Sequence, residues 1–221
     1  MATQFAKFVN YDFKAGFWRK RAVNAALDRH EDRKQTWGGV RITKFPSDCF
    51  AMQKLLCRCR PQVLVELGSQ HGGSALFFSS FAQLAGIETI VSVDVAEIEK
   101  PDIQIVTWLT GDSSSPEIFE KVKTLVGNRT CSLVVDSNHH ADHVDKELAL
   151  YAPLVSPGQA LIMEDTLVDI LNFRKFRVGG GPLRSLKKHL AQHPDFEMAE
   201  DIEPYVTTNF FGYWTRKPAM R

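Results

Sequence analysis

An excess of charge of either sign is the first feature that the sequence lacks. Its 27 lysines and arginines are balanced by 26 aspartates and glutamates, which leaves a formal net charge of +1 over 221 residues. Surfaces that bind nucleic acid or acidic membranes are normally marked by clustered positive charge. We therefore expect neither nucleic acid nor a membrane among the partners of this protein.

Long hydrophobic runs are absent as well. The longest apolar stretches have the length of strands or are interrupted by polar residues, so no transmembrane span is predicted. Residues 1–7 contain no continuous apolar segment of the kind that signal peptides carry, which favours a cytoplasmic protein over a secreted one. The cysteines have neither zinc-site nor disulfide-framework spacing, and we interpret all four as reduced thiols: Cys49, Cys57, Cys59 and Cys131.

What the sequence does contain is the composition of one globular domain. Hydrophobic residues make up 44% of the chain and charged residues 24%, and the length is sufficient for a substantial core. Residues 1–45 differ from the rest because they interleave aromatic with basic side chains. We expect them to form an N-terminal extension that packs on the core or on a second subunit, and residues 46–221 to form the main domain.

Strand and helix patterns alternate from Pro61 onward, which predicts an α/β fold with a mostly parallel sheet and helices on both faces. Five strands are expected at residues 63–66, 87–95, 103–109, 131–135 and 159–163. Helices are expected at residues 48–60, 75–84, 142–152 and 182–192, with a further helix starting at Ser115-Pro116. Ser47 is the expected N-cap of the first helix. Residues 196–202 and 209–216 are expected to form an antiparallel strand pair at the C-terminus.

The segment from Val63 to Ser74 is the one around which we expect the chain to be organised. Three apolar residues and Glu66 are followed by a polar turn with glycines at 68, 72 and 73, and then by a helical pattern. Glycines let the main chain pass close to a ligand, and the first amides of a helix attract anions. This order predicts a buried strand that leads through a ligand-binding turn into a helix. The alternative is a turn whose glycines serve packing only.

Acidic residues stand at or just after the ends of the predicted strands. They are Glu66, Asp94, Asp112, Asp136, Glu164 and Asp165. In open parallel sheets ligands bind outside the carboxyl ends of the strands, so we expect these carboxylates to face a single crevice. Asp94 has the spacing of an acid that binds the ribose of NAD or of S-adenosylmethionine (SAM), and Asp112 is a candidate for contact with adenine. As the alternative, either aspartate caps a neighbouring turn or loop.

Three of these carboxylates form a sharper group, because Asp136, Glu164 and Asp165 end two strands that we expect to be neighbours. Carboxylates this close repel one another, so some must be protonated unless a cation lies among them. All-oxygen ligand sets suit Mg²⁺, Mn²⁺ or Ca²⁺ better than zinc. We therefore predict a divalent metal site; the alternative is that the three side chains bind backbone amides and lysines separately.

Two histidines, His139 and His140, follow Asp136 on the loop that leaves its strand. An imidazole titrates near neutral pH and can take a proton from a substrate hydroxyl. Either histidine is a candidate general base or metal ligand, and the alternative is an ordinary surface histidine.

Several segments taken together resemble the cephalosporin hydroxylase/rhamnosyl O-methyltransferase family. They are Trp37–Val40, Lys44–Asp48, Glu66–Ser74, Asp136–His143 and Leu161–Thr166, within a resemblance that runs from about Thr36 to Trp214. The resemblance implies a Rossmann-like class I methyltransferase fold, SAM as the cofactor, Mg²⁺ or Mn²⁺ as the metal, and O-methylation of a small molecule in natural-product biosynthesis. Because relatives of this family often assemble, it also implies a homo-oligomer.

The resemblance also implies roles for individual residues. Glu66, Gly68 and Ser74 match the SAM-binding turn, which in this sequence includes Ser69, Gln70, Gly72 and Gly73. Asp94 matches the ribose-binding acid. Asp136, Glu164 and Asp165 match the metal ligands, and His139 matches the general base. Relatives often carry an aspartate at the position of Asn138, so the resemblance implies a weaker or differently selective site in this protein.

Two other classes of function stay open at this point. The family's hydroxylase name suggests a non-haem iron oxygenase, in which two of the three histidines 139, 140 and 143 join Asp136 around iron. That arrangement leaves Glu164 and Asp165 without a role. The second class is a SAM-binding protein that has no catalysis of its own and stabilises another enzyme. For a methyltransferase the acceptor is open, because sugars, catechols and polyketides all present neighbouring hydroxyls.

Overall fold

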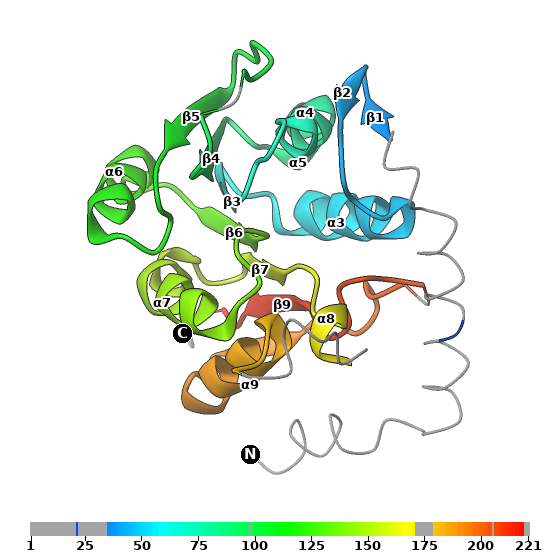
Figure 1. The fold of residues 1–221 in the computed structure, drawn as a ribbon, viewed down its shortest axis with the longest axis vertical. Helices are drawn as coiled ribbons and strands as arrows, with labels where there is room; N and C mark the ends of the chain where they lie inside the picture. The colour runs from blue at the N-terminus through cyan, green and yellow to red at the C-terminus, as the bar shows by residue number, and fades with distance from the viewer. Residues whose placement is uncertain (1–20, 22–34, 98, 171–178, 205, 219–221) are drawn as a thin grey trace.

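The computed structural model describes residues 21, 35–97, 99–170, 179–204 and 206–218, and its centre is a seven-stranded sheet (Figure 1). The strands lie in the order β5-β4-β3-β6-β7-β9-β8. Their bounds are Val63–Leu67 (β3), Thr89–Asp94 (β4), Val106–Thr110 (β5), Cys131–Val135 (β6), Ala160–Met163 (β7), Phe196–Met198 (β8) and Tyr213–Arg216 (β9). Strands β3 to β7 pair in parallel, whereas β9 is antiparallel to both β7 and β8.

Helices cover both faces of this sheet (Figure 1). One face carries α3 (Pro46–Cys59), α4 (Gly73–Ser80) and α5 (Ala82–Ala85), and the other carries α6 (Pro116–Val126), α7 (Ala141–Tyr151) and α9 (Pro182–Gln192). Two short helices, η1 (Ala152–Leu154) and α8 (Leu167–Ile170), complete the described part. Strand side chains alternate between faces, so in β3 Val63 and Val65 pack toward α6 and α7 while Leu64 packs toward α3 and α4.

A β-hairpin, β1 (Thr36–Trp37) and β2 (Val40–Arg41), precedes the sheet and packs on α4. Its turn is formed by Gly38 and Gly39, both with positive φ. The Trp37 ring meets the Phe77 ring edge-on, with centroids 5.1 Å apart. At Gly73 a Cβ atom would lie 2.1 Å from the Arg41 carbonyl oxygen, so the hairpin approaches the start of α4 too closely for any side chain.

The strand order reverses between β3 and β6. From β3 the chain proceeds outward through β4 and β5, and it then returns to place β6 and β7 on the other side of β3. Such a reversal opens a crevice outside the carboxyl ends of the two central strands. The segments that follow β3 and β6 meet there, since the Asp136 amide donates a hydrogen bond to the Leu67 carbonyl at 2.8 Å.

The predicted α/β class, the parallel sheet and the antiparallel C-terminal strands are confirmed, and α9 has the predicted bounds. Some local predictions are wrong. Ser47 does not cap α3, which begins at Pro46 after Phe45; its hydroxyl donates to the Val206 carbonyl instead. The helix expected over 75–84 is two helices that break at Phe81, and β4 and β5 are shorter than expected.

Two further predictions concern the N-terminus and membranes. Residues 1–20 and 22–34 lie outside the described part of the chain, so the N-terminal extension over 1–45 stays a prediction. Among the described residues, no helix combines the length and apolar character needed to cross a bilayer.

His189 on α9 makes the stability of the fold depend on pH. Its ring stacks on His193 with centroids 4.1 Å apart. Burial, followed by the nearby His193, lowers the pKa of His189 to about 4. An unfolded chain binds this proton near pH 6.5, so the stabilising contribution is complete above that pH and is lost as the pH falls toward 4.

We expect the wild type to lose about 1 kcal/mol more stability between pH 7 and pH 5 than His189→Gln, after allowance for solvent screening of the partly exposed ring. Urea unfolding of both proteins at the two pH values measures this difference. Equal losses in the two proteins would contradict it.

Candidate active site

The glycine turn after β3 is held in place from two directions. Gly68 has φ +95°, and a Cβ atom there would lie 2.0 Å from the Asp136 carbonyl oxygen, so glycine alone allows the segments after β3 and β6 to pack together. Gly72 has φ +83° and precedes the first residue of α4. The turn after β3 therefore packs directly on the loop after β6 that carries Asp136, at the point where the strand order reverses.

Asp94, at the end of β4, binds this turn directly. Its Oδ2 accepts hydrogen bonds from the Ser69 amide at 3.0 Å and the Gln70 amide at 2.7 Å, and its Oδ1 accepts from the Ala96 amide. Carboxylates that accept several backbone bonds hold a loop rigidly. The structure thus brings Asp94 to the predicted turn, where it fixes the backbone; contact with a ribose stays a prediction.

Glu66 lies deeper than the sequence suggested. Its side chain is fully buried on the face covered by α3 and α4. Oε2 accepts a hydrogen bond from Ser92 at 2.5 Å, while Oε1 has no hydrogen-bond partner among the described residues. Burial raises the pKa of Glu66, and the charge of Lys44 opposes that rise. Ser74 also donates to this carboxylate, so Glu66 joins the start of α4 to the strands beneath it.

Lys44 is a residue of this site to which the sequence reasoning gave no role. Its ammonium group is buried and donates to Asp136 Oδ2 at 2.9 Å and to Glu164 Oε1. Burial disfavours the charged ammonium, but the charges of Asp136, Glu164 and Glu66 outweigh burial and raise the pKa of Lys44 well above its usual value. Lys44 is therefore a fixed positive charge beneath the strand-end carboxylates. In the sequence, the one feature that pointed to Lys44 was its place in the segment Lys44–Asp48, which resembles the family.

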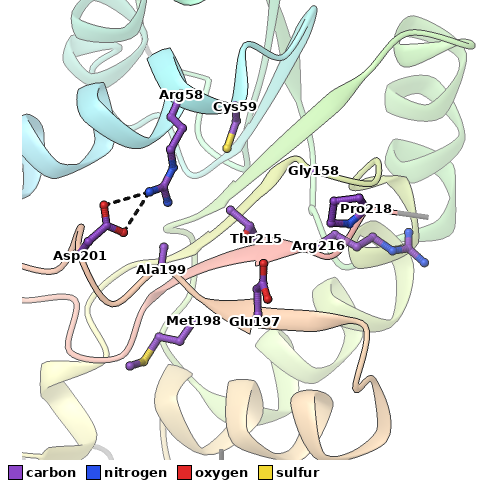
Figure 2. A pocket seen from close by; sticks show the side chains of 10 residues that line it. All are labelled: Arg58, Cys59, Gly158, Glu197, Met198, Ala199, Asp201, Thr215, Arg216 and Pro218. Atoms are coloured by element: carbon purple, nitrogen blue, oxygen red, sulfur yellow. Dashed lines mark hydrogen bonds and ion pairs between the residues drawn. The ribbon is translucent and has the colours of Figure 1, made fainter. Parts of the chain in front are cut away.

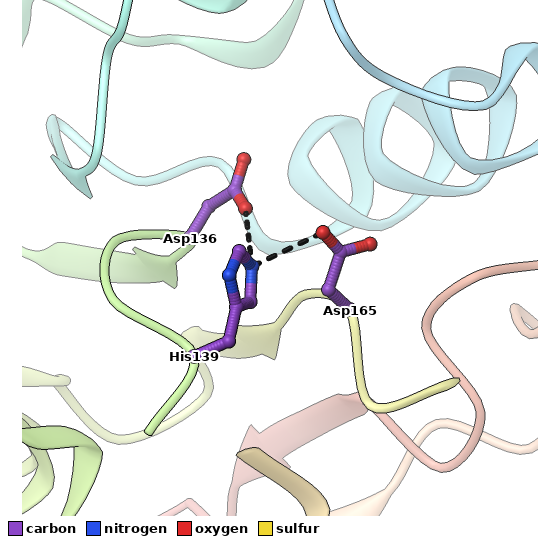
Figure 3. A group of neighbouring side chains, drawn as sticks. All are labelled: Asp136, His139 and Asp165. Carbon is purple, nitrogen blue, oxygen red and sulfur yellow. Dashed lines mark ion pairs between the residues drawn. The ribbon is translucent and has the colours of Figure 1, made fainter. Parts of the chain in front are cut away.

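His139 lies between two of the predicted metal ligands (Figure 3). Its Nε2 is 3.1 Å from Asp165 Oδ2 and 3.6 Å from Asp136 Oδ1. Burial disfavours the imidazolium, but the neighbouring carboxylates of Asp136 and Asp165 outweigh burial and raise the pKa of His139 to about 10. In this arrangement the ring is protonated at neutral pH and bridges the two carboxylates.

Asp165 is held in a conformation that non-glycine residues rarely adopt, with φ +50°. Its amide donates to Asn209 Oδ1 at 2.8 Å, and the Asn209 amide group donates to the Tyr213 hydroxyl at 3.3 Å. Tyr213 in turn donates to the buried Asp48 at 2.7 Å. Asp48 also accepts from Thr207 and Thr208. The start of α3 and the C-terminal segment therefore support the loop that carries Asp165.

The donor atoms at this point of the fold suit a hard divalent cation. Asp136, His139 and Asp165 each offer one ligand atom, and these atoms lie within 4.8 Å of one another. Among the described residues, Lys44 and His139 are the basic groups that pair with Asp136, Glu164 and Asp165. Burial, followed by the neighbouring Asp136, raises the pKa of Glu164 well above its usual value.

Two of the three predicted ligands, Asp136 and Asp165, thus belong to the clustered donor group. Glu164 follows β7 beside them, but its Oε1 is bound to Lys44. The third donor of the cluster is the His139 nitrogen. Lys44 binds both Asp136 and Glu164, and His139 lies between Asp136 and Asp165, while a single crevice that all the strand-end carboxylates face stays a prediction.

Asp112 lies outside this cluster. Its side chain is exposed, and Oδ1 accepts a hydrogen bond from the Ser114 amide at 2.8 Å, which holds the loop after β5. Backbone hydrogen bonds from that loop lower the pKa of Asp112. Contact with adenine stays a prediction for this residue. Asn138 Oδ1 accepts from the His140 amide at 3.0 Å, so this departure from the family pattern shapes the loop before α7.

A separate pocket lies at the opposite end of the sheet, between the end of α3 and strands β8 and β9 (Figure 2). The Arg58 guanidinium binds Asp201 at its edge, with distances of 2.9 and 3.0 Å to the two carboxylate oxygens. Cys59 ends α3 before β3, and Gly158 precedes β7, so the pocket faces the amino ends of the parallel strands. Ligands of such sheets bind at the carboxyl ends, and the strand-end site is therefore the functional candidate.

Comparison with known proteins agrees with this geometry. A family model described as Rhamnosyl O-methyltransferase/CmcI matches residues 30–217. The rhamnosyl O-methyltransferase of Mycobacterium leprae (strain TN) is 29% identical over 175 residues, which are 73% of this chain and 73% of that protein. The rhamnosyl O-methyltransferase of Mycobacterium tuberculosis (strain ATCC 25618 / H37Rv) is 27% identical over 199 residues, 84% of this chain and 76% of that protein.

Solved structures share the fold at lower identity. CmcI with Mg and SAM superposes with a TM-score of 0.64 at 20% identity and covers 83% of this chain and 77% of that one. The MycE methyltransferase in complex with Mg, S-adenosylhomocysteine (SAH) and mycinamycin VI superposes with a TM-score of 0.55 at 19% identity, over 76% of this chain and 47% of that one.

The sheet order and its switch point give this chain the fold of class I methyltransferases such as CmcI and MycE. More particularly, the chain belongs to the rhamnosyl O-methyltransferase/CmcI family, and it is an O-methyltransferase.

Proposed function

We propose that this protein transfers the methyl group of SAM to a hydroxyl of a small natural-product acceptor, with a divalent cation, Mg²⁺, at the strand-end site. The observation that carries the proposal is the arrangement of Asp136, His139 and Asp165 beside the glycine turn, at the switch point of the sheet. Relatives named rhamnosyl O-methyltransferase favour a sugar hydroxyl as the acceptor.

The cation would be held by Asp136 and Asp165, with Glu164 as the third acidic ligand, and His139 Nε2 would lie beside it as a proton acceptor rather than as a ligand. When bound, such a cation lowers the pKa of a hydroxyl that it coordinates and orients that hydroxyl. The carboxylate oxygens of Asp136 and Asp165 support this assignment, because Mg²⁺ prefers oxygen ligands.

His139 is the proposed general base. Its Nε2 is the titratable atom that faces the gap between Asp136 and Asp165. A base must begin neutral, and the two carboxylates alone keep this ring protonated at neutral pH. His139 can therefore act as a base only when a cation compensates the negative charge of Asp136 and Asp165. In the proposed site these same two carboxylates hold the cation. Afterwards they stabilise the imidazolium that forms.

SAM would lie along the crevice with its methionine end at the turn from Gly68 to Ser74 and its adenosine toward Asp94 and Asp112. The amides at the start of α4 suit the carboxylate of the methionine end of SAM, because a helix N-terminus attracts anions. Asp94 fixes the backbone of the turn that this binding needs. Positioning of the two reactants supplies much of the acceleration in such a transfer.

The iron oxygenase alternative fits the geometry less well. Its usual ligand set has two histidines and one carboxylate, whereas the clustered donors here are one histidine and two carboxylates. His143 does not join them, because its Nε2 lies 3.3 Å from Glu147. Family membership argues against the non-catalytic alternative.

Radioactive methyl transfer from SAM to a panel of rhamnosides and other vicinal diols tests the proposal. We expect transfer that depends on added Mg²⁺ and is abolished by a chelator. Asp136→Asn is expected to bind SAM as the cation-free wild type does and to lose transfer. If purified protein bound no SAM, or if transfer were equal with and without the cation, the corresponding part of the proposal would fail.

A further inference from the structure

A second buried carboxylate, outside the metal cluster, connects two loops at the carboxyl edge of the sheet. Glu147 on α7 is fully buried, and its Oε1 accepts hydrogen bonds from both Ser113 and Ser137. Ser113 belongs to the loop after β5, and Ser137 to the loop after β6. The two loops come from strands that are not neighbours in the sheet, and this carboxylate joins them.

The loops that Glu147 joins have different proposed tasks. Ser113 directly follows Asp112, the residue predicted to lie near the adenine of SAM. Ser137 directly follows Asp136, the residue that pairs with Lys44 and His139. A shift of either loop therefore changes the hydrogen bonds of the same oxygen atom.

His143 and Tyr151 complete the surroundings of Glu147. His143 Nε2 lies 3.3 Å from Glu147 Oε1 and 3.2 Å from the Ser113 hydroxyl, while its Nδ1 is 4.0 Å from Asp112 Oδ1. Glu147 Oε2 and the Tyr151 hydroxyl are buried and have no hydrogen-bond partner among the described residues. Burying a carboxylate with one oxygen unsatisfied is costly, so packing alone gives no reason for an acid at this position.

We infer that Glu147 is a positioning residue that couples the SAM-binding loop to the loop of the metal and base site. The inference rests on the proposed function. Binding of SAM or SAH orders the Ser113 loop, and through Glu147 Oε1 it favours the position of Ser137 in which Asp136 faces the site. By reciprocity, the cation then strengthens binding of SAM or SAH by the same factor.

Calorimetric titration of SAH in the absence and presence of saturating Mg²⁺ measures this coupling without any turnover. We expect wild-type affinity for SAH to rise at least about 5-fold with the cation, the lower end of typical couplings. In Glu147→Ala the increase is expected to fall below about 2-fold. Glu147→Gln keeps an acceptor oxygen for both serines and is expected to retain most of the coupling.

Ser113→Ala and Ser137→Ala each remove one of the two hydrogen bonds and test the same link if Glu147→Ala does not fold. We expect each to lose the coupling, and the double variant to lose no more than either single one. Ser79→Ala is the matched control, because that hydroxyl bonds only within α4. Variants that lower the melting temperature but keep the coupling would overturn the inference, as would a wild type that binds SAH and Mg²⁺ independently. A wild type that binds no SAH would instead contradict the proposed function.

Discussion

Lys44→Met is expected to destabilise the protein by about 3–5 kcal/mol, the usual cost of removing one partner from a buried ion pair. Methionine fills a similar volume, so the loss comes from charge rather than from a cavity. Without the ammonium, Asp136, Glu164 and Glu66 are left buried without their shared counter-charge. Urea unfolding at pH 7 measures the difference in the free energy of unfolding.

Lys54→Met is the matched control for that experiment. Lys54 also pairs with an acid, Asp201, at 3.6 Å, but both side chains are more than half exposed. Exposed pairs contribute about 0–1 kcal/mol, so this variant is expected to stay close to the wild type. Added Mg²⁺ is expected to restore part of the stability of Lys44→Met. A Lys44→Met protein as stable as Lys54→Met would show that the buried ammonium does not hold the carboxylates together.

His139→Gln is expected to lower the rate of methyl transfer by about 10²–10⁴-fold, the usual contribution of a general base. Glutamine keeps a hydrogen-bonding group near Asp136 and Asp165 but cannot take a proton. Affinity for SAH is expected to be unchanged, because the substitution leaves the glycine turn, Ser137 and Glu147 in place. Single-turnover rates with saturating SAM and acceptor measure the effect on chemistry, and SAH binding reports whether the fold is intact.

His140→Gln is the matched control, one residue further along the same loop. The side chain of His140 is not a member of the clustered donor group, and its amide is bound by Asn138. We expect its rate to stay within about 3-fold of the wild type. Equal losses in both variants would point to a disturbed loop rather than a lost base, and no loss in His139→Gln would assign the base elsewhere.

The fold could be predicted from the sequence because its signals are local. β3 begins with three apolar residues, Val63 to Val65, because both of its faces are covered, and Gly86 and Gly127 directly follow the last residues of α5 and α6. The acids after the strands were found because parallel strands bring their carboxyl ends to one edge. These inferences need only the order of residues along each element.

The contacts of the site could not be predicted, because they join residues far apart in the chain. Lys44 reaches Asp136 and Glu164 across 92 and 120 residues, and Asp48 reaches Tyr213 across 165. No pattern in the sequence indicates that Lys44 is buried, since a lysine near a helix start normally lies in water. Glu66 was expected to face the crevice, but it is fully buried. Its position in β3 places its side chain on the face of the sheet that α3 and α4 cover.

The central claim is that SAM and a divalent cation meet in one crevice between the glycine turn and Asp136. Mn²⁺ in place of Mg²⁺ tests this directly, because its unpaired electrons broaden the NMR signal of a nearby [methyl-¹³C]SAM. We expect strong broadening of the bound methyl signal in the wild type and none in Asp136→Asn at the same Mn²⁺ concentration. Bound SAM whose methyl signal stays sharp while Mn²⁺ is also bound would contradict the claim.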